Sequence, residues 1–520
     1  MIVFMDEKIY CTPSQMKDLE KASNEAGVDY RRLMDNAGGI AAAYIMDKMH
    51  ENGIPGPAVI LCGKGNNGGD GFVVAKDLSE IGMLVYCVLV DGDPVSELAS
   101  VQLGELAAGG TVPIIMLSDN KESVFNILED SSVIVDAVYG TGFHGELPPD
   151  IAEVLEFAGK CKAMKFAVDI PSGGNGSSGA AARQTIKADY TVTFGLEKIG
   201  TVLSPLKELC GVMYIADIGI PSACVKTMTR LIRPVTLENV KASVPIRPSD
   251  AHKGMFGRVL NIAGCESMPG AAALSTSSML RSGAGLVKLA SVKNVVRSLS
   301  ASLYECTYMP LSASSDGSIS GDNAAALASE AAKYDVTAIG CGLSVTEGTK
   351  KIVKSVINSS PKKLIIDADG LNCLSGCIDI IRNTKGETAV TPHPAELGRL
   401  LGITTEEVLA DRLGAALRFN SLYETTIVAK GSPTFIVSCD KTYVSFTGNP
   451  GLSRGGSGDV LTGIIAGLAA IGLHVDEAAA IGAFIHGYAA DRAADKLSQT
   501  GMLPSDVTAE LPFVFNEMNR

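Results

Sequence analysis

The sequence predicts an α/β protein of two successive domains, each built around a largely parallel β-sheet. Its 520 residues exceed the roughly 250–300 residues at which a single hydrophobic core stops growing. Hydrophobic residues make up 46% of the chain, aromatic residues only 5%, and tryptophan is absent, which is typical of α/β layers with buried parallel strands. Apolar, strand-like runs also alternate with helical stretches along the chain.

Composition and charge exclude several classes of partner. The formal net charge is −13 and no basic tract occurs, so we expect no nucleic acid or membrane partner. The first ten residues include Asp6 and Glu7 and lack an apolar core, so we expect no signal peptide, and no run of about 18 uncharged apolar residues occurs. The 12 cysteines lack zinc-like spacing, which favours reduced, buried thiols. We therefore expect a cytoplasmic protein, and Ala-rich helices in both halves are compatible with a homo-oligomer.

The first half shows one long helical pattern followed by regular alternation. The helical pattern covers residues 19–49, and a strand at 58–62, a helix at 71–81 and a strand at 84–90 follow. Further strands are expected at 112–116, 133–137, 166–170, 190–194 and 212–215. This alternation predicts a doubly wound, Rossmann-like sheet up to about residue 220.

A proline-rich stretch separates this pattern from a second one. Prolines at 221, 234, 245 and 248 interrupt the alternation, so we place the boundary near residue 235 and expect domains at 1–235 and 236–520. Strands are then expected at 258–263, 286–290, 336–340, 364–367, 388–391, 426–430 and 434–437. The last two are joined by residues 431–433, which predict a hairpin turn, and helices are expected at 457–471 and 476–497.

A glycine-rich stretch, GKGNNGGDG at residues 63–71, follows the first strand of the Rossmann-like half. It satisfies the GxGxxG pattern, which alone favours an ordinary NAD oxidoreductase. Asn66, Asn67 and Asp70 place polar side chains where a dinucleotide-binding turn mostly needs bare backbone. A tight β–α turn without a ligand is the simplest alternative.

Two more polar loops follow later strands of the same half. They are DAVYGTGFHGE at 136–146 and VDIPSG at 168–173, and ligands of open α/β sheets bind at the carboxyl ends of strands. Asn67, Asp136 and Ser172 offer hard oxygen ligands, which suit a monovalent or divalent cation and not zinc. Asp169 would face the same crevice and is placed for proton transfer, although either aspartate could instead cap a turn.

Taken together, GNNGGDG, DAVYGTGFHG and VDIPSG resemble the N-terminal YjeF family, the NAD(P)H-hydrate epimerases. The resemblance implies inversion of C6 in a nicotinamide ring that has gained water across its C5–C6 bond. It implies that Asp169 is the catalytic carboxylate and that Asn67, Asp136 and Ser172 bind K⁺. It also implies that the hydrated dinucleotide binds to Asn66, Asn67, Gly68, Gly69, Asp70, Gly140, Thr141, Gly142, Phe143, His144, Gly145, Glu146 and Asp169.

A second glycine-rich stretch, NPGLSRGGSGD at residues 449–459, leads into an apolar helix. Its glycines expose N–H donors at the helix start, which suits a terminal phosphate. Asp459 lies two residues into the helix, where it could accept the proton of an attacking hydroxyl. Neither glycine-rich stretch is a Walker sequence, and a glycine-rich helix start without a ligand is the alternative.

Three further stretches of the second half contain candidate binding residues. Lys430 in KGSPT could contact a nucleotide, or could be a solvated hairpin lysine. His393 in TPHPAE is held between two prolines at a strand end, which favours a ligand contact over a purely structural role. DADG at 367–370 could position substrate or magnesium, or could equally form a turn.

Residues 245–500 resemble the C-terminal YjeF domain, a ribokinase-like ADP- or ATP-dependent NAD(P)H-hydrate dehydratase, through IIDADGLN, TPHPAE, KGSPT and GGSGDVLTG. The resemblance implies that Mg²⁺ enters with ADP or ATP and that Asp459 is the catalytic base. It implies hydrate contacts from Ala272, Gly342, His393 and Asp459. It implies nucleotide contacts from Lys430, Gly431, Ser432, Pro433, Thr434, Gly455, Gly456, Ser457 and Gly458. Cys341 stands where the family usually has proline, a departure that concerns ligand fit rather than the base.

The two resemblances together predict an enzyme with two linked activities. It would interconvert the R and S forms of NADHX and NADPHX at C6. It would then restore NAD(P)H from the S form by phosphorylating the C6 hydroxyl with ADP or ATP and eliminating phosphate. The preferences for ADP or ATP and for NADHX or NADPHX stay open. The alternative is a ribokinase-type small-molecule kinase fused to a dinucleotide-binding sensor domain.

Overall fold

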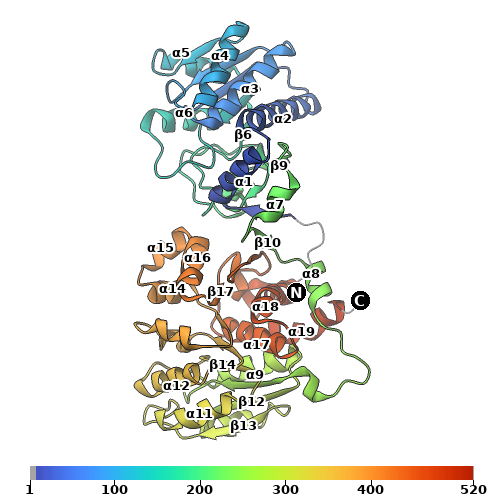
Figure 1. The fold of residues 1–520 in the computed structure, drawn as a ribbon, viewed down its shortest axis with the longest axis vertical. Helices are drawn as coiled ribbons and strands as arrows, with labels where there is room; N and C mark the ends of the chain where they lie inside the picture. Colours follow the sequence, from blue (N-terminus) through green and yellow to red (C-terminus); the bar gives the residue numbers. More distant parts are fainter. Residues whose placement is uncertain (1–7, 519–520) are drawn as a thin grey trace. The chain divides into compact units, whose positions relative to one another are not determined.

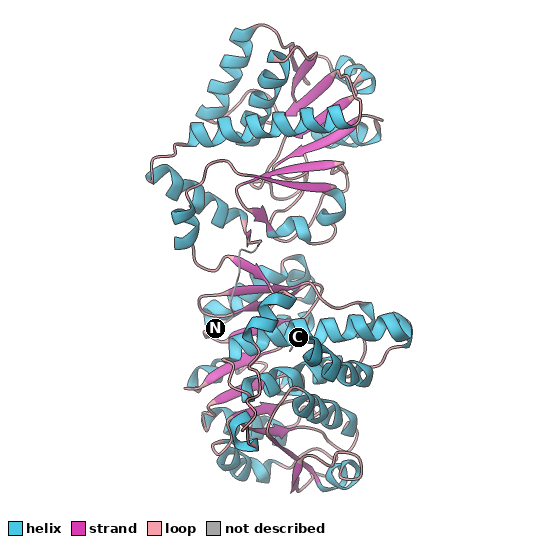
Figure 2. Ribbon diagram, turned by 90° about the vertical axis from the view of Figure 1, so that its right-hand side faces the viewer, coloured by secondary structure: helices cyan, strands magenta, loops and turns pink. Residues whose placement is uncertain are grey.

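The structure is a computed structural model that describes residues 8–518 and forms two compact units, Ile9–Leu231 and residues 232–518 (Figures 1 and 2). Most of the stretch in which no signal peptide is expected, residues 1–7, lies outside the described residues. Within the described residues, no helix is both long and apolar enough to cross a membrane. All 12 cysteines are free thiols and most are buried, as expected.

The N-terminal unit is built on a seven-stranded sheet in the order β4-β3-β2-β5-β6-β7-β9, with every neighbouring pair parallel. Its strands, together with the separate parallel pair of β1 and β8, are β1 Tyr10–Cys11, β2 Ala58–Cys62, β3 Val85–Leu89, β4 Ile114–Met116, β5 Val133–Ala137, β6 Met164–Val168, β7 Tyr190–Phe194, β8 Glu197–Lys198 and β9 Val212–Ala216. Its helices are α1 Pro13–Glu25, α2 Tyr30–Glu51, α3 Asn66–Glu80, α4 Glu97–Gly109, α5 Lys121–Asp130, α6 Pro149–Lys160 and α7 Ser222–Thr227.

Helices cover both faces of this sheet, because alternate strand residues enter two separate cores. In β2, Ile60 packs in the core formed with α2, α3 and α4, whereas Val59 and Leu61 pack in the core formed with α5 and α6. The doubly wound, Rossmann-like prediction is therefore confirmed.

Two predicted helices differ from the structure. The pattern over 19–49 is two helices, α1 and α2, because Gly27 adopts a left-handed φ of 96° and Asp29 caps α2 by accepting a hydrogen bond from the Arg32 N–H at 2.8 Å. The helix expected at 71–81 already begins at Asn66 in α3. Residues 63–65 are enough to complete the turn, so Asn66–Asp70 lie on the first turns of the helix rather than in a loop.

The C-terminal unit holds a sheet in the order β13-β12-β11-β14-β15-β16-β17-β18-β19-β10, parallel except that β18 runs antiparallel to both neighbours. Its strands are β10 Ile232–Pro234, β11 Arg258–Ile262, β12 Leu286–Val292, β13 Thr307–Leu311, β14 Val336–Ile339, β15 Lys363–Ile366, β16 Glu387–Val390, β17 Thr426–Ala429, β18 Thr434–Val437 and β19 Thr442–Ser445. Its helices are α8 Leu237–Ser243, α9 Pro269–Arg281, α10 Lys293–Leu299, α11 Ala324–Ala331, α12 Glu347–Asn358, α13 Asp369–Asn372, α14 Pro394–Leu401, α15 Thr405–Ala410, α16 Arg412–Tyr423, α17 Ser457–Ala470, α18 Val475–Gly501 and α19 Pro504–Met518.

Helices α9, α17, α18 and α19 pack together as one layer on this sheet, with α17 as its buried centre (Figure 1). Every strand predicted in this half is present, and β17 and β18 form the predicted hairpin. The prediction missed β10, β13 and β19. Strand β13 is an edge strand that contains Pro310 and buries only its last residue, Leu311, so it lacks the continuous apolar run that marks the others.

Candidate functional site

The three polar loops of the N-terminal unit meet at the carboxyl end of its sheet, as predicted. The Ser172 hydroxyl accepts a hydrogen bond from the Tyr139 N–H at 2.8 Å, and the Thr141 N–H donates to Asp169 Oδ2 at 3.2 Å. A Cβ atom added at Gly63 would lie 2.0 Å from the Val138 carbonyl oxygen, so the first loop packs directly on the second.

Glycine is required where backbones approach most closely. A Cβ atom at Gly68 would lie 1.8 Å from the Gly63 carbonyl oxygen, so the first turn of α3 leaves no room for a side chain. A Cβ atom at Gly140 would lie 3.0 Å from both Asn67 Oδ1 and Asp169 Oδ2. The Asn67 amide and the Asp169 carboxylate therefore both lie close to the backbone of Gly140.

Asp169 follows β6 directly and is held by a buried lysine that the sequence did not reveal. Its backbone has a left-handed φ of 67°, unusual for a residue other than glycine, and its N–H donates to the Val192 carbonyl at 2.7 Å. Lys198 Nζ donates to Asp169 Oδ1 at 2.6 Å and to the Thr193 hydroxyl at 3.1 Å. Both oxygens of Asp169 are therefore fixed, Oδ1 by Lys198 and Oδ2 by the Thr141 N–H.

Two further carboxyl groups lie in the electrostatic field of this pair. Burial alone would lower the pKa of Lys198, but Asp169, with smaller contributions from Cys11 and Glu20, outweighs it and raises that pKa, which keeps the ammonium charged. Burial, and then the charges of Asp169 and Glu20, raise the pKa of Asp70 well above its usual value. The site therefore combines a carboxylate paired with a cation and a carboxyl group that favours its neutral form.

The residues expected to hold a cation lie beside this group. Asp136 is buried and accepts a hydrogen bond from the Ser172 N–H at 2.8 Å, and a close one from the Ser172 hydroxyl. Burial raises the pKa of Asp136 to about 6, although these hydrogen bonds partly oppose the shift. No basic side chain within residues 8–518 forms an ion pair with it. The donor set is oxygen-rich and carries an uncompensated charge, which fits a monovalent or divalent cation.

Asn67 Nδ2 is buried and has no hydrogen-bond partner in the protein, so this amide keeps a free donor for a ligand. A cavity of about 610 Å³ opens next to these loops. It is lined by residues of the GTG loop, among them Phe143, His144, Gly145 and Glu146, and by residues 180–184. The structure therefore places the second half of the predicted substrate loop on a hollow of the size that small ligands occupy.

The second site lies at the carboxyl ends of β14, β15 and β17 in the C-terminal unit. Lys430 Nζ donates to Asp367 Oδ1 at 2.9 Å and lies 3.9 Å from a carboxylate oxygen of Glu396. The Thr462 hydroxyl donates to Asp367 Oδ2 at 2.7 Å. Lys430 is thus no solvated hairpin lysine, and both oxygens of Asp367 are engaged within the protein. Burial opposes ionisation of Asp367, but Lys430 and the hydrogen bonds lower its pKa below the usual value.

Asp459 lies in the first turn of α17 and meets these groups. Its pKa is raised to about 6 by burial and by the charge of Asp367, against the opposing effects of the Cys341 thiol and Lys430. The sulfur of Cys341 and one carboxylate oxygen each of Asp367 and Asp459 lie within 4.8 Å of one another. A carboxyl group with a pKa near neutrality suits proton transfer at physiological pH.

The glycine-rich stretch leads into α17 and lies against the cluster formed by Lys430, Asp367 and Asp459. A Cβ atom at Gly458 would lie 3.3 Å from Lys430 Nζ and 3.6 Å from Asp367 Oδ2. Gly456 precedes the helix with a left-handed φ of 101°, which turns the chain into it. The buried Ser457 hydroxyl has no hydrogen-bond partner in the protein. The Ser457 N–H donates to the Arg454 carbonyl at 3.3 Å, so the N–H groups of Gly455, Gly456 and Gly458 are the ones that can bind an anion at this helix start.

The remaining predicted residues lie close by but have structural partners of their own. His393 caps α14 by accepting from the Ala395 N–H at 3.2 Å, and burial, with Lys430 and Arg399, lowers its pKa. A Cβ atom at Gly342 would lie 2.8 Å from Ala271 Cβ, next to the predicted contact Ala272. The turn of the hairpin is held by Arg412, which donates to the Ser432 and Pro433 carbonyls, each at 2.7 Å.

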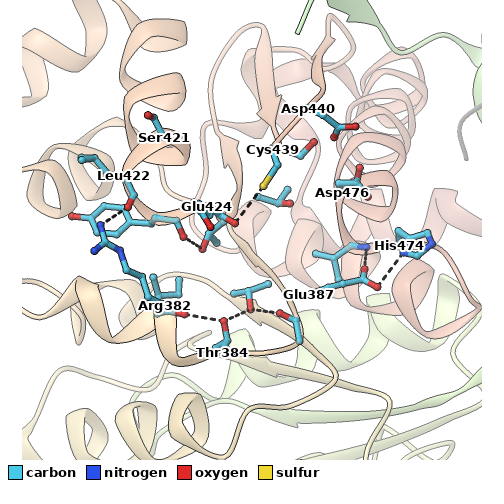
Figure 3. Close-up of a pocket in the computed structure, with 18 residues that line it drawn as sticks. Arg382, Thr384, Glu387, Ser421, Leu422, Glu424, Cys439, Asp440, His474 and Asp476 are labelled. Atoms are coloured by element: carbon cyan, nitrogen blue, oxygen red, sulfur yellow. Dashed lines mark hydrogen bonds and ion pairs between the residues drawn. The ribbon is translucent and has the colours of Figure 1, made fainter. Parts of the chain in front are cut away.

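A cavity larger than the one beside the GTG loop lies elsewhere in the C-terminal unit. It has about 750 Å³ and lies at the amino ends of β16 and β17, where its lining includes Arg382, Glu387, Cys439 and His474 (Figure 3). Glu387 accepts from the Val475 N–H at 2.6 Å and thereby caps α18. None of the predicted site residues lines this cavity, since they lie at the opposite ends of the strands.

Comparison with known proteins covers both units. The YjeF_N family model, described as YjeF-related protein N-terminus, matches residues 30–200, and the Carb_kinase model, described as NAD(P)H-hydrate dehydratase, matches residues 259–512. A bifunctional NAD(P)H-hydrate repair enzyme of Thermofilum pendens is 34% identical over 502 residues, which cover 96% of this chain and 94% of that protein. Its counterpart from Moorella thermoacetica is 35% identical over 516 residues, which cover 98% and 96%. A solved ADP/ATP-dependent NAD(P)H-hydrate dehydratase from Bacillus subtilis, co-crystallised with ATP/Mg²⁺, is 30% identical, with 55% of this chain and 99% of that one covered at a TM-score of 0.48.

Proposed function

This chain belongs to the family of bifunctional NAD(P)H-hydrate repair enzymes, and from that membership we propose how its residues divide the work. It is an enzyme that epimerises the R and S forms of NAD(P)H hydrate and dehydrates the S form to NAD(P)H at the expense of ADP or ATP. The epimerase is assigned to residues 1–235 and the dehydratase to residues 236–520. One observation carries the assignment: each unit places a carboxylate, the buried Asp169 or the half-buried Asp459, beside a glycine-rich helix start at the carboxyl end of its sheet.

In the epimerase, Asp169 takes and returns a proton while the bonds at C6 are broken and remade. Lys198 holds its Oδ1, so Oδ2 is the oxygen that faces the loop backbone and the substrate. Asp70 and the free amide donor of Asn67 face the same region and bind polar groups of the hydrated ring. Gly68, Gly69 and the loop from Gly140 to Glu146, together with Asn66, provide backbone and side-chain contacts to the dinucleotide.

The cation of the epimerase is K⁺, held by Asn67, Asp136 and Ser172. The buried, unpaired charge of Asp136 and the neutral oxygen donors around it support this choice, since K⁺ prefers oxygen ligands and low charge. A bound K⁺ would supply a positive charge at this site, where Asn67, Asp136 and Ser172 would hold it.

In the dehydratase, Asp459 takes the proton of the C6 hydroxyl as that oxygen attacks the terminal phosphate of ADP or ATP. The helix start at Gly455, Gly456, Ser457 and Gly458 holds the phosphate, with Lys430 and the hairpin to Thr434 along the nucleotide. Loss of phosphate from C6 and of a proton from C5 then restores the C5–C6 double bond. His393, Ala272 and Gly342 line the ring, and Mg²⁺ enters with the nucleotide.

A ribokinase-type kinase fused to a dinucleotide sensor is the competing hypothesis. It predicts a stable phosphorylated alcohol, whereas repair predicts free phosphate together with reduced nicotinamide. The full-length similarity to repair enzymes favours repair. We also expect a homo-oligomer and a cytoplasmic location, where NADH and NADPH are hydrated.

The test is direct. Purified full-length protein is incubated with an equal mixture of both NADHX epimers, MgADP or MgATP and KCl, and the absorbance of the dihydronicotinamide is followed together with phosphate release. Full recovery of both epimers with stoichiometric phosphate is expected. Recovery of neither epimer, or a phosphorylated product without phosphate release, would overturn the proposal.

A further inference from the structure

The segment that leads into the phosphate-binding helix start is tied to one helix, α18 (Figure 1). Asp491, in the second half of that helix, accepts a hydrogen bond from the Gly448 N–H at 2.9 Å through Oδ2. Its other oxygen, Oδ1, accepts from the Asn449 side-chain amide, also at 2.9 Å. One carboxylate therefore holds two consecutive residues of the chain.

Asn449 passes this constraint along the segment. Its Oδ1 accepts from the Gly451 N–H at 2.9 Å, and its backbone carbonyl accepts from the Leu452 N–H at 3.0 Å. The short helical turn Pro450–Leu452 is thus fixed from its first residue. Three residues further on, Gly455 begins the phosphate-binding stretch.

The segment also packs closely against α18. A Cβ atom at Gly487 of α18 would lie 2.4 Å from the Thr447 hydroxyl oxygen and 2.5 Å from the Thr447 carbonyl carbon. A Cβ atom at Gly451 would lie 2.8 Å from the Gln499 carbonyl oxygen. The segment therefore lies against α18 at Thr447 and again at Gly451, where an added Cβ atom would also lie 2.5 Å from the Met502 sulfur.

The end of α18 is shaped to receive the same segment. Ser498 interrupts the helix with a left-handed φ of 66° and a ψ of 157°, so the carbonyls that follow it turn out of the helical pattern. The guanidinium group of Arg454 donates to one of them, the Thr500 carbonyl. Arg454 directly precedes the phosphate-binding glycines, so both sides of the segment are anchored on α18.

Among residues 8–518, the Asp491 carboxylate has no hydrogen-bond partners other than Gly448 and Asn449. Its neighbour Arg492 is paired with Glu510 and Glu517, and no ion pair joins Asp491 to a basic side chain within residues 8–518. Its charge serves only two N–H donors of this segment. Hydrogen bonds to an ionised acceptor are stronger and better oriented than those between neutral groups.

We propose that Asp491 is a positioning residue of the dehydratase: through Gly448 and Asn449 it fixes the segment 447–454, so that the N–H groups of Gly455, Gly456 and Gly458 meet the terminal phosphate of the nucleotide. This inference rests on the proposed dehydratase function. It adds a residue outside the nucleotide contacts that sets the geometry of those contacts.

The test compares Asp491→Asn and Asp491→Ala with wild type in the full-length protein. An amide at position 491 keeps the size of the carboxylate but turns a donor toward one of the two N–H groups. We expect the Kd of MgADP, measured by calorimetry without hydrate, and the KM for ADP to rise at least about tenfold in both variants. The KM for the hydrate should change less than twofold, and epimerase turnover, which uses the other unit, should equal that of wild type.

Asp495→Asn is the matched control, since Asp495 lies one turn further along α18 and is exposed. It should leave the Kd of MgADP, both KM values and epimerase turnover unchanged. Asn449→Ala removes the middle of the relay, so the double variant with Asp491→Asn should lose little more than either single variant. A folded Asp491→Asn protein with wild-type affinity for MgADP would overturn the inference. A wild-type protein that releases no phosphate with ADP would instead overturn the proposed function.

Discussion

Lys198 Nζ lies 2.6 Å from Asp169 Oδ1, and both groups are buried. A lysine enclosed in this way keeps its charge only because the carboxylate is there, and the carboxylate keeps an orientation because the lysine makes its other hydrogen bonds to Thr193 and Phe194. The pair therefore fixes both the charge and the direction of the group placed for proton transfer.

Replacing Lys198 with methionine should remove this support. The buried Asp169 charge would lose its partner, a loss that costs about 3–5 kcal/mol in folding stability. We expect epimerase kcat to fall at least about 100-fold, while the hydrate still binds and the dehydratase of the same chain works normally. Steady-state kinetics of both activities check this. Lys187→Met, at an exposed lysine of the same unit, is the control. Epimerase kcat within a factor of two of wild type would contradict the role of Lys198.

The dehydratase should lose activity in mild acid. Asp459 has a pKa of about 6, and as a base it must be ionised, so kcat/KM should be constant above that pH and fall about tenfold per unit below it. Pre-steady-state or initial-rate measurements on the S epimer from pH 5 to 8 give the profile. Asp459→Asn should be inactive at every pH. A profile that stays flat down to pH 5 would show that another group is the base.

K⁺ should stabilise the N-terminal unit more at pH 7 than at pH 5. The pKa of Asp136 is raised to about 6 in the folded state, so folding favours its protonated form, and ionisation above that pH costs up to about 3 kcal/mol of stability. A bound cation offsets this cost only when the carboxylate is charged. Thermal unfolding in KCl and in NaCl at the two pH values measures the difference. In Asp136→Asn the preference for K⁺ should vanish; an equal K⁺ effect in that variant would exclude Asp136 as a ligand.

Two glycines of one turn should respond differently to alanine. At Gly68 the new methyl group would lie 1.8 Å from the Gly63 carbonyl oxygen, whereas at Gly65 nothing lies within 4 Å. Gly68→Ala should destabilise the N-terminal unit by at least about 2 kcal/mol and abolish epimerase activity. Gly65→Ala should cost about 1 kcal/mol or less, as expected at a helix N-cap. Chemical denaturation followed by tyrosine fluorescence and epimerase assays distinguish them, and equal losses would mean that the turn relaxes.

The sequence pattern predicted the fold because its cause is local. Short apolar runs rich in branched residues, such as 58–62 and 133–137, predict buried strands, and both appear as β2 and β5 with those bounds. Helix starts were less predictable: α3 begins at Asn66, five residues early, because the glycines that suggested a loop also fit the first helical turn.

The site was predictable only where residues follow strands. Asp169 and Asp367 directly follow β6 and β15, and strand ends gather at one edge of a parallel sheet. Lys198, Arg412 and Asp491 could not be predicted, because each acts through a partner that only the tertiary fold brings near. A single lysine in the otherwise uncharged run 198–205 is the one signal that could have pointed to a buried cation.

The division of labour between Asp169 and Asp459 is tested most directly by one experiment on the epimer mixture. Asp169→Asn and Asp459→Asn proteins are assayed separately and together with MgADP and KCl, and the restored dihydronicotinamide is measured against a blank without enzyme. The account predicts that Asp169→Asn restores dihydronicotinamide only from the S epimer, and that Asp459→Asn restores none. The two variants together should restore it from both epimers. Full recovery by Asp169→Asn alone, or any recovery by Asp459→Asn above the blank, would contradict it.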